Sequence, residues 1–217
     1  GTSSWGTRQP TRRSVSVIRT GPYHTLHNPD GSLVDDTYWF EHDYLGSPRP
    51  FEPRNGWKRI ESFRRWAQIR IKVVPYSSEI EQLICRYALA LDQTNLDVAF
   101  LYLWSILESV TNTVGANYTE TIKRAAWIFS DPPLVREWLE ALRRRRNQFV
   151  HKGRIGDDDW VVYLAKTLIE PHLMRLLRNG FRLNCIEEYG ELLTQPDNEV
   201  EIRRRQALLS KARRLKR

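Results

Sequence analysis

The segment from Val98 to Leu107 constrains the fold of this chain more than any other part of the sequence. It is apolar on nearly every side of an ideal helix, and the preceding residues Asn95-Leu96-Asp97 are typical of a helix start. A helix that is apolar all round must be covered from several directions. It is therefore either the central helix of a bundle or a helix covered in part by a second subunit, and the sequence predicts a mainly α protein.

The chain divides into three regions. Residues 1–75 are rich in glycine, proline and turn dipeptides such as Asn28-Pro29 and Asp30-Gly31, which predicts a small N-terminal lobe of strands and irregular loops. Helical periodicity dominates residues 76–195, and residues 196–217 are expected to form a basic C-terminal helix or tail. Within the lobe, extended segments are predicted at Ser14–Arg19, Leu33–Phe40 and Gln68–Val74.

Three further helix starts are marked in the predicted helical domain. Ser77-Ser78, followed by glutamates, has the pattern of a capped start. Asp131-Pro132-Pro133 opens another helix, because proline is tolerated in a first turn. Acidic side chains at positions 157 to 159 open the next one, where the positive end of the helix dipole favours them over the alternative of a cation site.

One arginine falls within the apolar stripe of the helix that begins after Asp131. On an ideal wheel Arg146 lies about 40° from Leu142, on the side that also carries Val135, Trp138, Leu139 and Phe149. A guanidinium keeps its charge at ordinary pH, and burying it without a partner costs on the order of several kcal/mol. We therefore expect an anion to meet Arg146, either a carboxylate such as that of Glu108 or a ligand phosphate.

His151 follows Arg146 by five residues, near the end of the same predicted helix. The negative end of the helix dipole favours the charged imidazole and the neighbouring arginines oppose it, so its protonation is expected to be poised for acid–base chemistry. Asn147 and His151 lie about 40° apart on the wheel, but Arg146 and His151 lie about 140° apart. A second, symmetry-related helix or a frayed last turn would be needed to aim both at one atom. The plainer alternative is a histidine cap and a structural ion pair.

These residues resemble a known motif. Arg146-Asn147-x3-His151 resembles the Arg-x4–6-His signature of the HEPN (higher eukaryotes and prokaryotes nucleotide-binding) superfamily. The segment FLYLWSILESV at Phe100–Val110 is similar to the aromatic-rich helix of Apea-like HEPN proteins, and RNQFVHKG at Arg146–Gly153 resembles their RN-x-x-VH-x-G segment. The resemblance covers roughly residues 77–180 and implies a HEPN-like antiparallel helical bundle.

The resemblance implies metal-independent RNA cleavage by a homodimer whose arginine–histidine pairs line one cleft. Attack by the ribose 2′-OH needs a proton acceptor, a donor for the leaving 5′-oxygen and positive charge at phosphorus. His151 and Arg146 would supply these, Asn147 would orient the phosphate or the imidazole, and Glu108 and Lys152 would be supporting residues. The product would carry a 2′,3′-cyclic phosphate.

The Apea-like group further implies a toxin-like effector in anti-phage defence, with an upstream sensor domain or an antitoxin as further partners. Because many superfamily members only bind RNA or only dimerise, the alternative is a non-catalytic RNA-binding or dimerisation module of a larger defence protein.

Positive charge is concentrated at the C-terminal end. Residues 203–217 hold eight basic side chains and no acid, equal to the formal net charge of +8, whereas residues 1–202 hold 26 basic and 26 acidic groups. Such a segment binds nucleic-acid phosphates without choosing a sequence; the alternative is a solubilising end. The expected RNA-binding residues are Arg143, Arg145, Arg203, Arg204, Arg205, Lys211, Arg213 and Arg214.

Other ligand sites are weakly indicated. His24, His27 and His42 are of metal-ligating type but match no zinc spacing, and no glycine-rich phosphate loop is found, so we expect neither metal nor cofactor. Cys85 and Cys185 lack metal-ligand spacing and suggest reduced thiols. No apolar run reaches the roughly 18 residues that cross a bilayer and no secretory leader opens the chain, so we expect a cytoplasmic protein.

Overall fold

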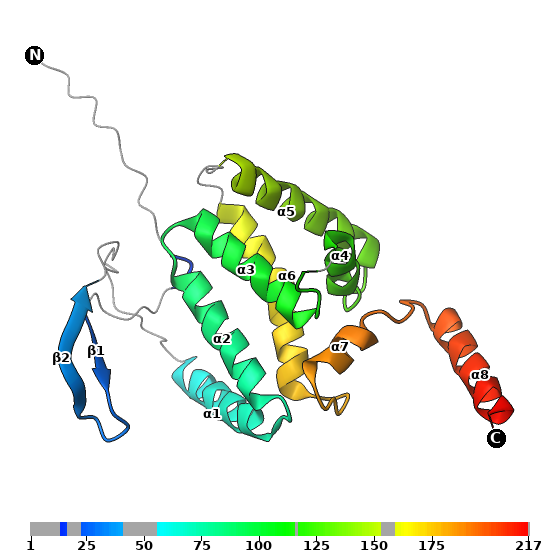
Figure 1. Ribbon diagram of the computed structural model, residues 1–217, viewed down its shortest axis with the longest axis horizontal. Coiled ribbons are helices and arrows are strands. Elements are labelled where there is room, and N and C mark those ends of the chain that lie inside the picture. The colour runs from blue at the N-terminus through cyan, green and yellow to red at the C-terminus, as the bar shows by residue number, and fades with distance from the viewer. Residues whose placement is uncertain (1–13, 17–22, 41–55, 116, 153–158, 217) are drawn as a thin grey trace, which may run out of the picture.

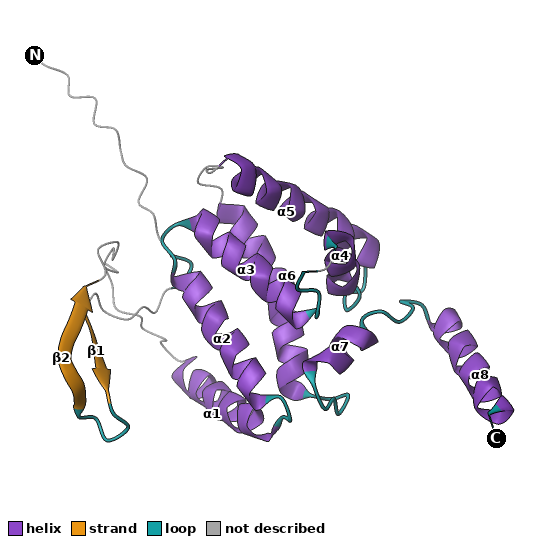
Figure 2. Ribbon diagram, in the orientation of Figure 1, coloured by secondary structure: helices purple, strands orange, loops and turns teal. Residues whose placement is uncertain are grey.

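The computed structural model describes residues 14–16, 23–40, 56–115, 117–152 and 159–216. In these ranges it is mainly helical, with one small antiparallel sheet of two strands (Figure 2), which confirms the predicted fold class. The elements are β1 (Tyr23–His27), β2 (Leu33–Phe40), α1 (Trp57–Val73), α2 (Ser77–Asp92), α3 (Leu96–Val110), α4 (Tyr118–Ala126), α5 (Pro132–Lys152), α6 (Asp159–Arg178), α7 (Ile186–Leu192) and α8 (Glu199–Leu215).

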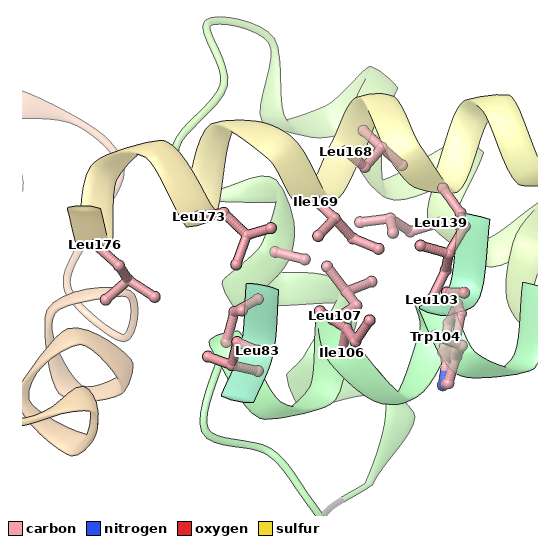
Figure 3. Close-up of a cluster of buried hydrophobic side chains, with 14 of the residues drawn as sticks. Leu83, Leu103, Trp104, Ile106, Leu107, Leu139, Leu168, Ile169, Leu173 and Leu176 are labelled. Carbon is pink, nitrogen blue, oxygen red and sulfur yellow. The ribbon is translucent and has the colours of Figure 1, made fainter. Parts of the chain in front are cut away.

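Helix α3 is the centre of the bundle. It packs against α2 on one side and α6 on another, and α4 and α5 cover it further (Figure 1). Side chains from α2, α3, α5 and α6 meet in one apolar cluster, shown in Figure 3, which includes Leu83, Leu103, Ile106, Leu139 and Ile169. Most of the apolar segment Val98–Leu107 is thus covered within a single chain, as the central-helix interpretation predicted, and Tyr102 stays exposed.

Local capping explains two of the predicted helix starts. The Asn95 side chain accepts hydrogen bonds from the backbone N–H groups of Asp97 and Val98, and Asp131 accepts one from Leu134 over 3.1 Å. Each bond satisfies an N–H group that the first turn of a helix leaves without a partner. Helix α2 begins at Ser77 as predicted, but Tyr76 is its N-cap and no side chain caps it. Helix α6 begins at Asp159, and the two aspartates before it lie outside the described residues.

The expectation of an extended segment at Gln68–Val74 is wrong, because all but its last residue belong to α1. The alternating β-branched residues favoured a strand, but tertiary contacts favour the helix. Arg70 donates hydrogen bonds to the carbonyl oxygens of Leu177 and Arg178 at the C-terminal end of α6. Helices packed on the bundle therefore begin at Trp57 and not at residue 76, where we expected the helical domain to start.

The predicted strand at Leu33–Phe40 is confirmed as β2, which pairs with β1 in an antiparallel hairpin. The turn between them contains Gly31, whose φ of 87° favours glycine. The Asp30 carboxylate accepts hydrogen bonds from the backbone and hydroxyl of Ser32, which lowers the pKa of that carboxyl. Of the extended segment predicted at Ser14–Arg19, residues 14–16 are irregular and the others lie outside the described ranges.

A buried histidine ties three helices together. His172 of α6 is fully buried, with Nδ1 lying 2.9 Å from the hydroxyl of Tyr189 in α7 and Nε2 lying 3.0 Å from the carbonyl oxygen of Ala125 in α4. Since a carbonyl only accepts, Nε2 carries the proton and Nδ1 accepts from the tyrosine. Burial is the main cause that lowers the pKa of His172 to about 4, so the imidazole is neutral near pH 7.

Helix α8 extends away from the other helices in Figure 1 and has no buried residue. Cys85 is exposed and Cys185 half-buried, and neither forms a disulfide. Within the described part of the chain, no helix combines the length and the apolar character needed to span a membrane.

Candidate functional site

Helix α5 carries Arg146 on its inner face. Val135, Leu139 and Leu142, which precede it on the predicted stripe, are buried against the core, whereas Trp138 at the edge of that stripe is exposed. Arg146 is half-buried. The helical period therefore places the guanidinium where the sequence predicted it. A charge in this position needs a compensating contact.

The compensating contact is an aromatic ring. The guanidinium carbon of Arg146 lies over the ring of Tyr118, 5.0 Å from its centroid. Tyr118 is the first residue of α4, whose start is capped by Asn117. The negative face of an aromatic ring attracts a cation, with a contribution of about 0.5–2 kcal/mol depending on exposure. The pairing holds α4 and α5 together at this point, and Figure 1 shows the two helices side by side.

The ring of Tyr118 contacts a second aromatic residue from α3. Its centroid lies 6.0 Å from that of Trp104 at an interplanar angle of 71°, an edge-to-face arrangement. Trp104 is almost fully buried, and its Nε1 donates a hydrogen bond to Glu108 Oε1 over 2.8 Å. Contacts in series thus connect Arg146, Tyr118, Trp104 and Glu108 across three helices.

The expected pairing of Glu108 with Arg146 is not formed. Glu108 instead accepts from Trp104, one turn earlier on its own helix, and no carboxylate among the described residues makes an ion pair with Arg146. The reason is geometric, because a residue four positions away on one helix lies within reach whatever the neighbouring helix does. The N–H donors of Arg146 are therefore not used by a carboxylate in this part of the structure.

The other two predicted catalytic residues follow on α5. Asn147 is half-buried beside Arg146, and His151 and Lys152 form the last residues of the helix. The side chains of His151 and Lys152 lie outside the described residues, so the distance between the imidazole and Arg146 stays a matter of prediction. Helix α5 does bring the three positions onto its C-terminal half.

Arg143 and Arg145 lie on the same helix. The Arg143 guanidinium makes an ion pair with Glu140 over 2.8 Å, both side chains being about one third exposed. Arg145 is half-buried and engaged in its own interactions. Arg143 thus differs from Arg146 in its partner: Arg143 pairs with a carboxylate, whereas Arg146 makes a cation–π contact with an aromatic ring.

The basic residues of α8 differ along the helix. In its first half, Arg203 and Arg204 pair with Glu199 and Glu201, and Arg205 donates to Gln195. In its second half, Lys211, Arg213 and Arg214 are exposed and make no ion pair with the described residues. Positive charge available to a polyanion is therefore greatest toward the C-terminal end of α8.

Metal ligands do not gather in the described part of the chain, where no group of three or more histidine, cysteine and acidic residues could hold an ion. His27 bonds within its hairpin, to Gly31 and Thr25, and His24 stacks on Trp39. His42 lies outside the described residues.

Comparison with protein-family models, with curated proteins and with solved structures found no match for this chain.

Sequence reasoning placed Arg146 on the inner stripe of α5 but missed Tyr118 and the role of Trp104. No sequence signal joins Tyr118 to Arg146, because the two lie on different helices and their contact depends on how α4 packs against α5. The capping residue Asn117 marks a helix start, but not what its first side chain touches. Together these residues hold a permanent cation on an aromatic face, and no carboxylate among the described residues makes an ion pair with it.

Proposed function

We propose that this chain is a metal-independent endoribonuclease of HEPN type. The observation that supports the proposal is the environment of Arg146: it is half-buried on the inner stripe of α5, lies over Tyr118, and meets no carboxylate among the described residues. A guanidinium kept in this way is suited to bind a phosphate in two-point fashion. His151, in the last turn of the same helix, supplies the second chemical group.

The reaction proposed is internal transesterification. His151 accepts the proton of the ribose 2′-OH, whose oxygen attacks phosphorus. The bond from phosphorus to the 5′-oxygen breaks, and that oxygen takes up the proton that the His151 imidazole accepted from the 2′-OH. Arg146 stabilises the charge on the pentacovalent phosphorus and Asn147 orients the phosphate or the imidazole. The products are a 2′,3′-cyclic phosphate and a 5′-hydroxyl end. The reaction changes no oxidation state, so it needs no oxidant, and the proposed mechanism uses neither a metal nor a cofactor.

A homodimer is part of the proposal. Arg146 and His151 lie about 140° apart on an ideal helix, so one helix does not direct both toward one phosphorus. Two copies related by a two-fold axis would place the arginine of one beside the histidine of the other. Arg143 and Arg145 of α5 and the basic side chains of α8 would add affinity for RNA without choosing its sequence. By the resemblance, the setting is the cytoplasm, as a toxin-like effector in anti-phage defence controlled by a sensor domain or an antitoxin.

The test is cleavage of single-stranded RNA by purified protein in the presence of a chelator. We expect products ending in 2′,3′-cyclic phosphate, and a loss of at least about 100-fold in rate for His151→Ala and for Arg146→Ala. Arg144→Ala is the matched control, because Arg144 is an exposed arginine of the same helix. Unchanged cleavage in both site variants would remove the assignment. Tight RNA binding without turnover by the wild-type protein would favour a non-catalytic RNA-binding module, a reading that the exposed basic helix α8 also supports.

A further inference from the structure

The charge of a half-buried guanidinium can be compensated in two ways. They differ in how many of its N–H donors stay free to bind a ligand. A carboxylate partner occupies the N–H donors at the edge of the guanidinium plane. An aromatic ring contacts the cation through its face and uses none of those donors. Arg146 has the second arrangement, with its central carbon 5.0 Å from the centroid of the Tyr118 ring. Its donors are thereby left to an anion that approaches from the edge.

The ring that carries Arg146 is itself held in place. Tyr118 packs edge-to-face on Trp104, which is only 2% exposed and packs in turn near Phe100. The indole is fixed by its hydrogen bond to Glu108, and the backbone at Tyr118 is fixed by the Asn117 cap. The half-buried ring beneath the guanidinium therefore packs directly against the buried core.

The hydrogen bond from Trp104 also has an effect on charge. It engages Glu108, the acidic residue that the sequence offered as a counter-ion for Arg146, on the α3 side of the cluster. Each charged group thus has its own aromatic partner: the Glu108 carboxylate accepts from Trp104, and the Arg146 guanidinium lies over Tyr118.

We propose that Tyr118 is the positioning residue of this site, whose ring face holds the Arg146 guanidinium at the orientation required for an RNA phosphate. That the ligand is an RNA phosphate rests on the proposed function. The contact between Arg146 and Tyr118 does not depend on it. The ring acts through Arg146 and does not touch the reacting atoms. The hydroxyl of Tyr118 has no assigned role, because the contact with the cation is made by the ring.

Kinetics separate positioning from simple structural support. For Tyr118→Leu, which removes the ring face but stays apolar, we expect kcat to fall about 10- to 100-fold with KM for RNA changed less than about threefold, since the charge of Arg146 remains while its orientation is lost. Tyr118→Phe keeps the ring and is expected to retain kcat within about twofold. Tyr102→Leu, at an exposed tyrosine of α3, is the matched control. Wild-type kcat in Tyr118→Leu would overturn the proposal, and so would an equal loss in Tyr118→Phe.

A spectroscopic measurement tests the contact independently of cleavage. In a ¹H–¹⁵N spectrum of the arginine side chains, the Nε–H signal assigned by its loss in Arg146→Lys is expected to be shifted by the ring current of Tyr118. The shift should persist in Tyr118→Phe and in Tyr102→Leu and vanish in Tyr118→Leu, with thermal melting showing that each variant is folded. An Arg146 signal unchanged in Tyr118→Leu would overturn the positioning role. Absence of cleavage by the wild-type protein, with the ring-current result as expected, would remove the proposed reaction and leave the contact established.

Discussion

Trp104 Nε1 donates a hydrogen bond to Glu108 Oε1 over 2.8 Å, so the acidic residue that could have neutralised Arg146 is bound to its own helix. The bond satisfies an indole N–H that the core would otherwise leave without an acceptor, since Trp104 is only 2% exposed. Glu108 therefore acts as a structural residue of α3, and the contact that compensates the charge of Arg146 is made by the ring of Tyr118.

This assignment predicts how substitutions of Glu108 behave. Glu108→Ala removes the acceptor and leaves a buried donor without a partner, which should lower the free energy of unfolding by about 1–3 kcal/mol. Glu108→Gln keeps a carbonyl acceptor and should stay within about 0.5 kcal/mol of the wild type. Urea denaturation followed by circular dichroism measures both. A large loss in Glu108→Gln would instead indicate that the charge of Glu108 matters.

The buried His172 predicts a dependence of stability on pH. Burial lowers the pKa of His172 to about 4 in the folded protein, below the ordinary value of 6.5, so the unfolded chain takes up a proton first as pH falls. Stability is therefore full above pH 6.5, declines by up to about 1.4 kcal/mol for each pH unit on the way down to about pH 4, and changes no further below that.

Urea denaturation between pH 7.5 and about 4 checks this decline, with His172→Gln as the matched variant. A glutamine can still donate to the Ala125 carbonyl and accept from Tyr189, but it does not titrate. The difference between the two curves isolates the histidine from the carboxylates that also titrate in acid. Parallel curves for the two proteins would contradict the prediction.

Packing around α3 predicts a strong contrast between two leucines. Leu103 is fully buried at the centre of the bundle, whereas Leu209 of α8 is 69% exposed. Leu103→Ala should lower the free energy of unfolding by about 2–5 kcal/mol, because it removes apolar contacts and leaves a cavity. Leu209→Ala should change it by less than about 0.5 kcal/mol. Denaturant midpoints at one pH compare the pair, and a similar cost for both would mean that α8 is packed in solution.

The distribution of charge along α8 predicts the salt dependence of RNA binding. Replacing Lys211, Arg213 and Arg214 by glutamine should make the slope of log K against log salt less negative by about 2, at about 0.7 for each lost contact with single-stranded RNA. Thermal stability should not change, because α8 has no buried residue.

The control for that measurement removes the same charge elsewhere. Lys58, Arg59 and Lys72 are exposed basic residues of α1, and their replacement by glutamine lowers the net charge by the same amount. Filter binding of one RNA over a salt series compares the two triple variants. Equal changes in slope would show that net charge, and not α8, governs affinity.

Several features of the fold could be predicted because they depend on neighbours in the sequence. β-Branched and aromatic residues beside an Asp-Gly turn indicated β2, and Asn95 and Asp131 marked helix starts through bonds to N–H groups two or three residues away. Arg146 was placed on the inner face of α5 by helical period alone. At Gln68–Val74 the same local reasoning failed, since contacts of Arg70 with the end of α6 outweighed the local strand preference.

The amino-acid sequence by itself determined that the protein is a helical bundle around an apolar central helix, and that a cation lies in an apolar stripe five residues before a histidine. Local periodicity and capping suffice for this, because they act over one or two turns. Only the tertiary structure decided that a tyrosine from another helix, and not the glutamate of α3, meets Arg146. That choice depends on how α3, α4 and α5 pack against one another, and packing of distant segments is set by the shapes of many side chains together.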